Sequence, residues 1–335
     1  MMRAPAFWAD PDSLRARLLA PLGTLYGAVT LSRMAQPGGR AGVPVICVGN
    51  PTLGGAGKTP VAIALLRHIA AAGGRPFALL RGHGGTATTP LLVDPATHDA
   101  GHVGDEALLL ARVAPTVIAG SDRLAGARLA VARGASHIVM DDGFQNPTLH
   151  KDAAVLVVDG GFGIGNGRVF PAGPLRAPLA PQLARCDALL VVGDGPAGDR
   201  LATAGAGVPV LRGALVPDPA AVAALRGRPL HAFAGIGRPE KFFAMLRALG
   251  LDVAATTAFA DHHPYRIAEI ADLARGAAAA GAHLITTEKD LVRLGAAPFA
   301  EVRSTIAALP VTLDTAADGL QDLVRQAEAR HRQPE

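Results

Sequence analysis

The chain has 335 residues, half of them hydrophobic and only 18% charged, so it can bury a sizeable core and is not globally disordered. The formal net charge is +4, and neither a Lys/Arg block nor an aromatic-interleaved basic stripe occurs, which argues against nucleic acid as a partner. Two cysteines, Cys47 and Cys186, form no CxxC or Cys/His spacing, so we expect no disulfide framework, no zinc site and a reducing compartment.

The first predicted element is a helix over residues 14–31 with one apolar face. The residues of that face recur at helical spacing: Leu14, Leu18, Leu22, Leu25 and Val29. The uncharged run 18–32 is too short to cross a bilayer, and it contains a proline and two glycines. Residues 1–40 carry five arginines against two aspartates, hence a charge of +3. Such a helix fits a membrane interface or packing on the rest of the protein, and the sequence alone favours neither.

Strands and helices then alternate along the chain. We predict strands at 43–50, 75–82, 116–121, 137–142, 153–160 and 187–194, and helices at 58–73, 105–114 and 123–135. A Gly/Pro-rich stretch, 160–181, precedes the last of these strands. This alternation predicts an α/β fold with a mostly parallel sheet covered by helices on both faces.

The pattern loosens around residues 207–230, and a second set of elements follows. Four further strands are predicted at 230–237, 252–261, 282–290 and 309–314, with helices between them. We therefore expect three parts: an amphipathic helix region over 1–35, a large unit over 36–218 and a smaller α/β unit over 219–335.

The segment PTLGGAGKTP, residues 51–60, lies between a predicted strand and a predicted helix, as a phosphate-binding loop requires. We expect ATP to contact Thr52, Leu53, Gly54, Gly55, Ala56, Gly57, Lys58, Thr59 and Pro60. Lys58 would reach the β- and γ-phosphates, and the Thr59 hydroxyl would bind Mg²⁺. Thr52 stands where the general motif begins with glycine, which weakens the formal match but leaves the Gly-Lys-Thr chemistry in place.

Asp141 and Asp142 end the strand at 137–142, where acidic residues hold Mg²⁺ or its waters in phosphate-loop proteins. A polar strand end without a metal is the alternative. The guanine-reading pattern N/T-K-x-D is absent, because in TTEKD (286–290) Lys289 directly precedes Asp290. We therefore expect ATP rather than GTP.

Seven ordered blocks resemble the tetraacyldisaccharide 4'-kinase (lipid A 4'-kinase) family. They are VGNPTLGGAGKTP, LLRGHGG, VGDEALLLA, DDGFQN, GNGRVFPAGPLRAP, FAGIGRPEKFF with FADHHPY, and TTEKD. The resemblance implies a P-loop NTPase-like sandwich with a smaller α/β domain, ATP and Mg²⁺ as cofactors, and a glucosamine disaccharide lipid as substrate. It also implies a peripheral place on the cytoplasmic face of the bacterial inner membrane, without an obligate protein partner. A lipid acceptor favours the interfacial interpretation of the first helix.

The same resemblance implies roles for individual residues. Asp105 would take the proton of the acceptor hydroxyl, with His262 as its partner, although His263 is a close rival. From the sequence alone, Asp105 and Glu106 could equally be first-turn acids of a helix, and His262 a polar loop residue. Residues expected to stabilise phosphate charge are Lys58, Arg81 and Arg123, and those expected to contact the substrate are His83, Glu106, Gln145, Asn166 and Arg168.

Two positions depart from the family pattern: His83 replaces the usual Tyr, and Asn146-Pro147 replaces the commoner His-Arg. Lys289 fits either a place in the cleft or a surface pair. A competing hypothesis is a membrane-associated P-loop ATPase switch that controls partner binding. The GDE and DHH segments argue against it, because a switch does not need them.

Overall fold

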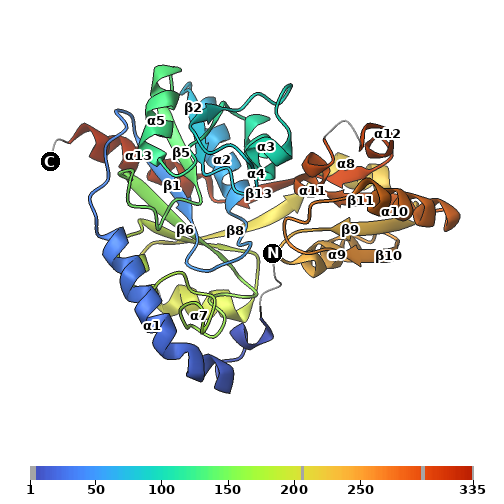
Figure 1. Cartoon of the computed structure of the whole chain (residues 1–335), viewed down its shortest axis with the longest axis horizontal. Helices are drawn as coiled ribbons and strands as arrows, with labels where there is room; N and C mark the ends of the chain where they lie inside the picture. Colours follow the sequence, from blue (N-terminus) through green and yellow to red (C-terminus); the bar gives the residue numbers. More distant parts are fainter. Residues whose placement is uncertain (1–4, 205–206, 296–298, 334–335) are drawn as a thin grey trace.

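The computed structural model describes residues 5–204, 207–295 and 299–333. Its strands form two separate sheets that lie side by side along the long axis of the molecule (Figure 1). The larger sheet contains β1 (Val45–Gly49), β2 (Pro76–Leu80), β3 (Leu91–Leu92), β4 (Thr116–Ile118), β5 (His137–Asp141), β6 (Ala153–Asp159), β7 (Ala188–Val192), β8 (Val210–Pro217) and β13 (Val311–Thr315). The smaller sheet contains β9 (Leu230–Ala234), β10 (Val253–Ala258), β11 (His283–Thr287) and β12 (Ala307–Leu309).

The larger sheet has the order β13-β8-β7-β6-β1-β5-β2-β4-β3 and is parallel except at its two edges, where β13 and β3 run antiparallel to their neighbours. This confirms the predicted α/β class. β1 lies between β5 and β6, so its carboxyl end opens at the middle of the sheet. Ligands of open α/β sheets bind at such a carboxyl edge.

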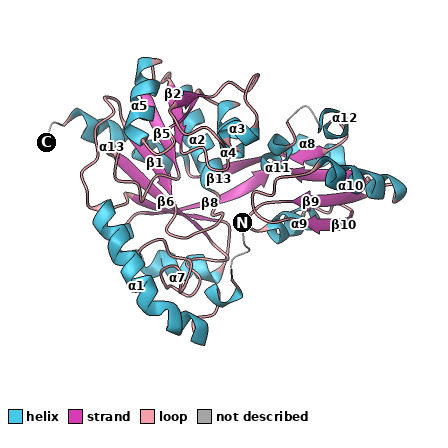
Figure 2. Ribbon diagram, viewed as in Figure 1, coloured by secondary structure: helices cyan, strands magenta, loops and turns pink. Residues whose placement is uncertain are grey.

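Helices cover both faces of the larger sheet (Figure 2). The helices of this part of the chain are α1 (Leu14–Met34), α2 (Lys58–Ala71), α3 (Ala100–Val103), α4 (Asp105–Ala111), α5 (Arg123–Ala132), α6 (Leu179–Leu183), α7 (Pro196–Ala204) and α13 (Ala317–Arg332), with a short 3₁₀ helix, η1 (Ala6–Trp8). α2, α4 and α13 pack in the core of one face, and α5 and α7 in that of the other.

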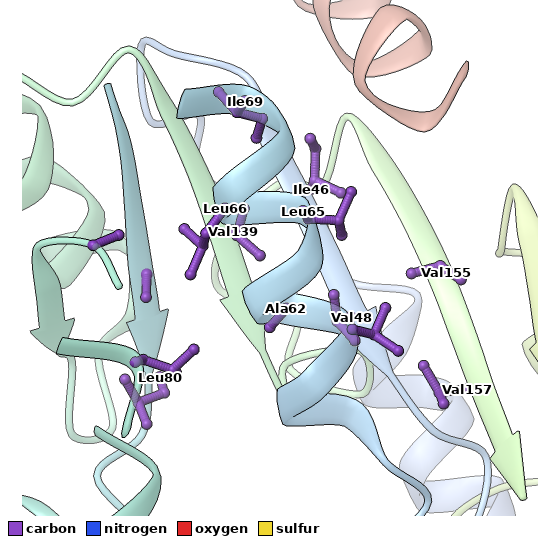
Figure 3. Close-up of a cluster of buried hydrophobic side chains, with 14 of the residues drawn as sticks. Ile46, Val48, Ala62, Leu65, Leu66, Ile69, Leu80, Val139, Val155 and Val157 are labelled. Atoms are coloured by element: carbon purple, nitrogen blue, oxygen red, sulfur yellow. The ribbon is translucent and has the colours of Figure 1, made fainter. Parts of the chain in front are cut away.

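Helix α2 fixes the phosphate loop to this sheet. Its buried residues Leu65, Leu66 and Ile69 lie over Ile46 of β1 and Val139 of β5 (Figure 3). Burying a side chain of this size contributes about 1.5–3 kcal/mol. The first turn of α2 is therefore held rigidly at the carboxyl end of β1.

The smaller sheet has the order β10-β9-β11-β12, and all its strand pairs are parallel. Its helices are α8 (Pro219–Leu225), α9 (Pro239–Ala248), α10 (Ile267–Ala279), α11 (Glu288–Arg293) and α12 (Ala300–Arg303). α8 and α9 fill one core, and α10 fills the other. This set of elements is the second, smaller α/β unit expected from the sequence.

The end of the chain departs from the expected division. The predicted strand at 309–314 was expected in the smaller unit, but β13 pairs antiparallel with β8, Val311 opposite Pro217. α13 then packs in the larger core through Leu320 and Leu323. β8 itself lies where the sequence pattern loosened. β13 at the sheet edge and β8 beside it alternate between half-buried and exposed positions over most of their length, and such a pattern does not reveal the partner strand.

Helix α1 presents its small residues inward and its leucines outward. Ala16, Gly23 and Gly27 are buried. A Cβ on Gly23 would lie 2.7 Å from the Val169 carbonyl oxygen, so the helix backbone packs directly on segment 165–178. The predicted apolar face, in contrast, is exposed: Leu18 by 81% and Leu25 by 65%. Among the described helices, none is both long and apolar enough to cross a membrane.

Candidate active site

The phosphate loop joins the carboxyl end of β1 to the first turn of α2. Gly54 and Gly57 have φ values of 103° and 87°, in the left-handed region where other residues are strained. Apart from Gly54 and its two chain neighbours, no described residue has a heavy atom within 4 Å of the position that a Cβ on Gly54 would take. The backbone N–H groups of such a loop at a helix N-terminus form an anion-binding nest.

Thr52, the departure from the general motif, is held by a second segment of the chain. Its side chain is buried, it forms a β-bridge with Leu175, and its carbonyl oxygen accepts a 3.1 Å hydrogen bond from Arg176 Nε. The next residue, Leu53, donates its N–H to the Pro174 carbonyl at 2.7 Å. The segment around Pro174 therefore supports the start of the loop, where the general motif would have a flexible glycine.

Thr59 and Asp141 face each other below the loop. The Thr59 hydroxyl donates to Asp141 Oδ2 at 3.0 Å, while the buried Oδ1 has no hydrogen-bond partner in the described part of the chain. Burial and the nearby charge of Glu106 raise the pKa of Asp141. A divalent cation would satisfy the free oxygen and stabilise its ionised form. The described residues contain no cluster of three or more His, Cys, Asp or Glu side chains able to hold a metal, but Mg²⁺ usually needs only one or two carboxylates besides phosphates and waters.

Asp142 is engaged differently. Arg176 binds both of its oxygens, at 2.7 Å and 3.1 Å, and Lys58 Nζ lies 3.7 Å from Oδ2. Burial would raise the pKa of Asp142, but the charges of Arg176 and Lys58 outweigh it and hold the pKa well below its usual range. We therefore expect Asp141, rather than Asp142, to face a metal ion, while Asp142 orients Arg176 and Lys58.

Asp105 and His262 meet across the two sheets. Asp105 begins α4 and is almost fully buried; His262 lies in the loop after β10, with its Nδ1 3.2 Å from Asp105 Oδ2. His262 has φ of 55°, and its N–H donates to the Gly235 carbonyl at 3.0 Å. His263 instead contacts Glu269 at 3.0 Å and stacks on Phe259. Of the two predicted histidines, His262 is therefore the one placed beside Asp105.

Two basic residues of α11 complete this cluster. Lys289 Nζ donates to Glu106 Oε1 at 2.9 Å and lies 3.4 Å from His262 Nε2, which places it next to the Asp105–His262 pair. Arg293 Nε donates to Asp105 Oδ2 at 2.6 Å. Burial would raise the pKa of Asp105, but the His262 hydrogen bond and the Lys289 and Arg293 charges hold it far below its usual range. Sequence reasoning missed Arg293. Its spacing of four residues from Lys289 on one helix face was the available signal.

The arginines expected near the phosphates lie close to each other. Arg123 is buried and donates to the Gly120 carbonyl. Burial and the neighbouring charge of Arg81 lower the pKa of Arg123. Arg81 itself is exposed just after β2. The predicted residue His83 lies with its ring centre 5.4 Å from that of His262, in an edge-on arrangement.

A family model described as tetraacyldisaccharide-1-P 4'-kinase (LpxK) matches residues 15–329, nearly the whole chain. The chain belongs to this family.

Curated relatives agree with the family model. A protein of Xanthobacter autotrophicus named tetraacyldisaccharide 4'-kinase is 64% identical over 98% of both chains. A protein of Azorhizobium caulinodans with the same name is 55% identical, again over 98% of both. A crystal structure of LpxK from Aquifex aeolicus in complex with ATP superposes with a TM-score of 0.71 at 26% identity, covering 94% of this chain and all of that one. The family resemblance and the fold predicted from the sequence are thus confirmed.

Two side chains predicted to bind substrate, those of Gln145 and Asn166, are engaged within the 4'-kinase fold itself. The Gln145 amide donates to the Asn50 carbonyl and to Gln182 Oε1, both at 3.0 Å. The Asn166 amide donates to the carbonyls of Phe7 and Ala172, and its Oδ1 accepts the Arg168 N–H. Gln145 therefore steadies the approach to the phosphate loop, and Asn166 ties η1 to segment 165–178. Their substrate roles remain predictions.

Proposed function

We propose that this chain is an ATP-dependent kinase that transfers the γ-phosphate to the 4'-hydroxyl of a tetraacyldisaccharide 1-phosphate in lipid A biosynthesis. The observation that carries the proposal is the Asp105–His262 pair, 3.2 Å apart, beside a glycine-rich loop with a phosphate-binding form. The names of relatives at 64% and 55% identity support the substrate, and the ATP complex of the Aquifex aeolicus protein supports the donor.

The phosphate loop would bind the donor. The N–H groups around Gly54 and Gly57 would hold the phosphate oxygens, and Lys58 would turn from Asp142 toward the β- and γ-phosphates. Thr59 and Asp141 would hold Mg²⁺, which supplies charge neutralisation to the phosphates when bound. Because the transfer needs little covalent chemistry from the protein, positioning of these groups is the main contribution.

Asp105 would orient the acceptor hydroxyl and accept its proton, and His262 would hold the carboxylate in place. Lys289 and Glu106 lie next to this pair. His262 belongs to the smaller unit and Asp105 to the larger one, so the proposed site is complete only when the two units approach. Because β13 pairs with β8 and α13 packs in the larger core, we propose that the smaller unit spans residues 219–310 and that residues 311–333 belong to the larger unit.

Helix α1 would place the enzyme on the membrane that contains its lipid substrate. Its outward apolar residues are joined by Phe170, which is 37% exposed and makes an edge contact with Tyr26. Exposed arginines Arg15 and Arg17 flank the apolar face and suit anionic headgroups. This arrangement supports peripheral binding to a membrane surface, which we propose is the cytoplasmic face of the bacterial inner membrane.

The test is a transfer assay with the full chain, ATP, Mg²⁺ and tetraacyldisaccharide 1-phosphate in detergent micelles. We expect labelled γ-phosphate to appear at the 4' position and Asp105→Asn to abolish transfer while leaving ATP binding intact. Arg325→Gln, a change at an exposed residue of α13, serves as the matched control. If vesicles without the disaccharide stimulate ATP turnover as much as the substrate does, and no phosphorylated disaccharide forms, the kinase proposal is contradicted. That result would favour a membrane-associated ATPase switch.

A further inference from the structure

We propose that Arg293 is a positioning residue for phosphoryl transfer: it fixes the Asp105 carboxylate so that one lone pair of Oδ1 faces the acceptor hydroxyl. The inference rests on the function proposed above and adds a residue to its site. Arg293 is the last residue of α11, and its side chain is 8% exposed. Its Nε reaches Asp105 Oδ2 at 2.6 Å, and the same guanidinium also contacts its own unit.

The guanidinium is anchored on the side of the smaller unit. Nη1 donates to the Gly235 carbonyl and to Asp290 Oδ1, each at 2.7 Å. Asp290 is fully buried and is itself fixed, because Tyr265 donates its hydroxyl to Oδ1 at 2.8 Å and Thr287 donates to Oδ2 at 2.7 Å. These contacts within the smaller unit hold the Arg293 side chain in one rotamer, independently of its contact with Asp105.

The Arg293 guanidinium decides which acceptor sites of the Asp105 carboxylate stay free. A carboxylate offers about four acceptor sites, two on each oxygen. Within the described residues, Asp105 Oδ2 meets both Arg293 and His262, whereas Oδ1 accepts one hydrogen bond, from the Glu106 N–H at 2.8 Å. The second site of Oδ1 remains for the acceptor. Without Arg293, the carboxylate could rotate and His262 alone would hold Oδ2.

In the proposed step, Asp105 accepts a proton while the γ-phosphate passes from ATP to the sugar hydroxyl. The hydroxyl proton passes to Asp105 Oδ1 as the sugar oxygen bonds to the γ-phosphorus. The bond from that phosphorus to the β–γ bridging oxygen breaks, and its electron pair leaves with ADP. A loose transition state demands alignment more than a strong base, so a strongly held carboxylate suits the step.

The charge around Asp105 agrees with this role. The titratable groups that face it are Glu106 on its own helix, Lys289, Asp290 and Arg293 on α11, and Asp261, His262 and the His83 ring from the loops. The positive groups keep Asp105 ionised. Removing Arg293 should therefore raise the pKa of Asp105. When the solution is acidified, Asp105 would then be protonated, and the transfer rate lost, at a higher pH than in the unsubstituted protein.

The experiment compares Arg293→Gln with Arg293→Lys and with Arg293→Ala plus added guanidinium, in the full chain. We expect Arg293→Gln to lower kcat by about tenfold or more with KM for ATP nearly unchanged, since misplacing a reactive group costs rate rather than nucleotide binding. In Arg293→Gln, the acid limb of the plot of kcat against pH should move to higher pH by about one to three units. Arg293→Lys should keep part of the charge effect without the fork geometry, and guanidinium should restore part of the rate of Arg293→Ala.

Unchanged kcat and an unshifted acid limb in Arg293→Gln would overturn the proposal. So would a loss of rate in Arg293→Ala that guanidinium does not restore, because Arg293 would then merely hold the smaller unit together. Thermal unfolding and ATP binding identify variants that fail to fold, and Arg293→Lys provides the test if Arg293→Gln is among them. Full activity in Asp105→Asn would also overturn the Arg293 proposal, because Arg293 would then have no reactive group to position. Failure of the unsubstituted chain to phosphorylate the disaccharide would instead contradict the proposed function.

Discussion

His262 Nδ1 lies 3.2 Å from Asp105 Oδ2, although one residue follows a strand of the smaller sheet and the other begins a helix of the larger. The left-handed backbone of His262 limits which substitutions its position tolerates. Asn adopts that conformation more readily than most residues and cannot replace the imidazole.

We therefore predict that His262→Asn preserves the fold but lowers kcat by about a hundredfold, the scale of a lost acid–base partner. His263→Asn is the matched control, because His263 pairs with Glu269 away from Asp105. Single-turnover transfer rates at saturating ATP measure the effect. Equal rates for both variants would show that the pair does not assist the reaction.

Asp141 and Asp142 should differ in their dependence on metal. Asp141 has a buried oxygen without a hydrogen-bond partner in the described residues, whereas both oxygens of Asp142 bind Arg176. Asp141→Asn should raise the Mg²⁺ concentration for half-maximal rate by about tenfold or more. Asp142→Asn should instead raise KM for ATP, because it releases Arg176 from the phosphate loop. A magnesium titration of each variant separates the two, and identical shifts would contradict the assignment.

Replacing Thr52 by glycine would restore the general phosphate-loop motif, yet we expect it to weaken this protein. Thr52 is buried and forms a β-bridge with Leu175, and a glycine loses that packing and adds entropy to the unfolded chain. We predict a loss of about 1–2 kcal/mol in the free energy of unfolding, measured by urea denaturation. Unchanged stability would mean that the Leu175 segment does not support the loop.

The outward leucines of α1 should control membrane binding without affecting the fold. Leu18→Glu with Leu25→Glu adds charge to two residues that are 81% and 65% exposed, so unfolding temperature should hardly change. Binding to vesicles of anionic phospholipid, measured by co-sedimentation, should fall by about tenfold or more. Ile267→Glu is the control, because Ile267 is 50% exposed on α10 of the smaller unit. Undiminished binding by the double variant would contradict the interfacial role.

Arg238 should help hold the smaller unit over the phosphate loop. It precedes α9, its Nη1 lies 2.8 Å from Asp159 at the end of β6, and its Nη2 donates to the Gly55 carbonyl at 3.1 Å. Its guanidinium also lies over the Phe162 ring, 4.7 Å from the centre. Arg238→Ala should raise KM for ATP several-fold. A double-mutant cycle with Asp159→Ala should give a coupling energy of about 1 kcal/mol or less, because the pair is partly exposed. If the free-energy effects of Arg238→Ala and Asp159→Ala simply add in the double variant, the Arg238–Asp159 contact does not couple the two units.

Much of this molecule follows from local sequence. The strand, loop and helix around residues 43–73 were predictable because a buried strand, left-handed glycines and a helical apolar period each constrain only neighbouring residues. The same holds for the acids that begin α4 and end β5. The ordered motifs identify the family, and the family resemblance implies the pairing of Asp105 with His262.

Other features depended on segments that are distant in the chain. An alternating strand pattern shows that one face is buried but not which strand lies beside it, so the pairing of β13 with β8 was missed. The periodicity of α1 identified an apolar face, and only packing of Gly23 and Gly27 on segment 165–178 decided that this face points outward. Arg176 on Asp142 and Arg293 on Asp105, the latter 188 residues apart, are likewise tertiary contacts. Motif and period report local backbone preference, whereas a partner for a buried charge is decided by which elements the fold brings together.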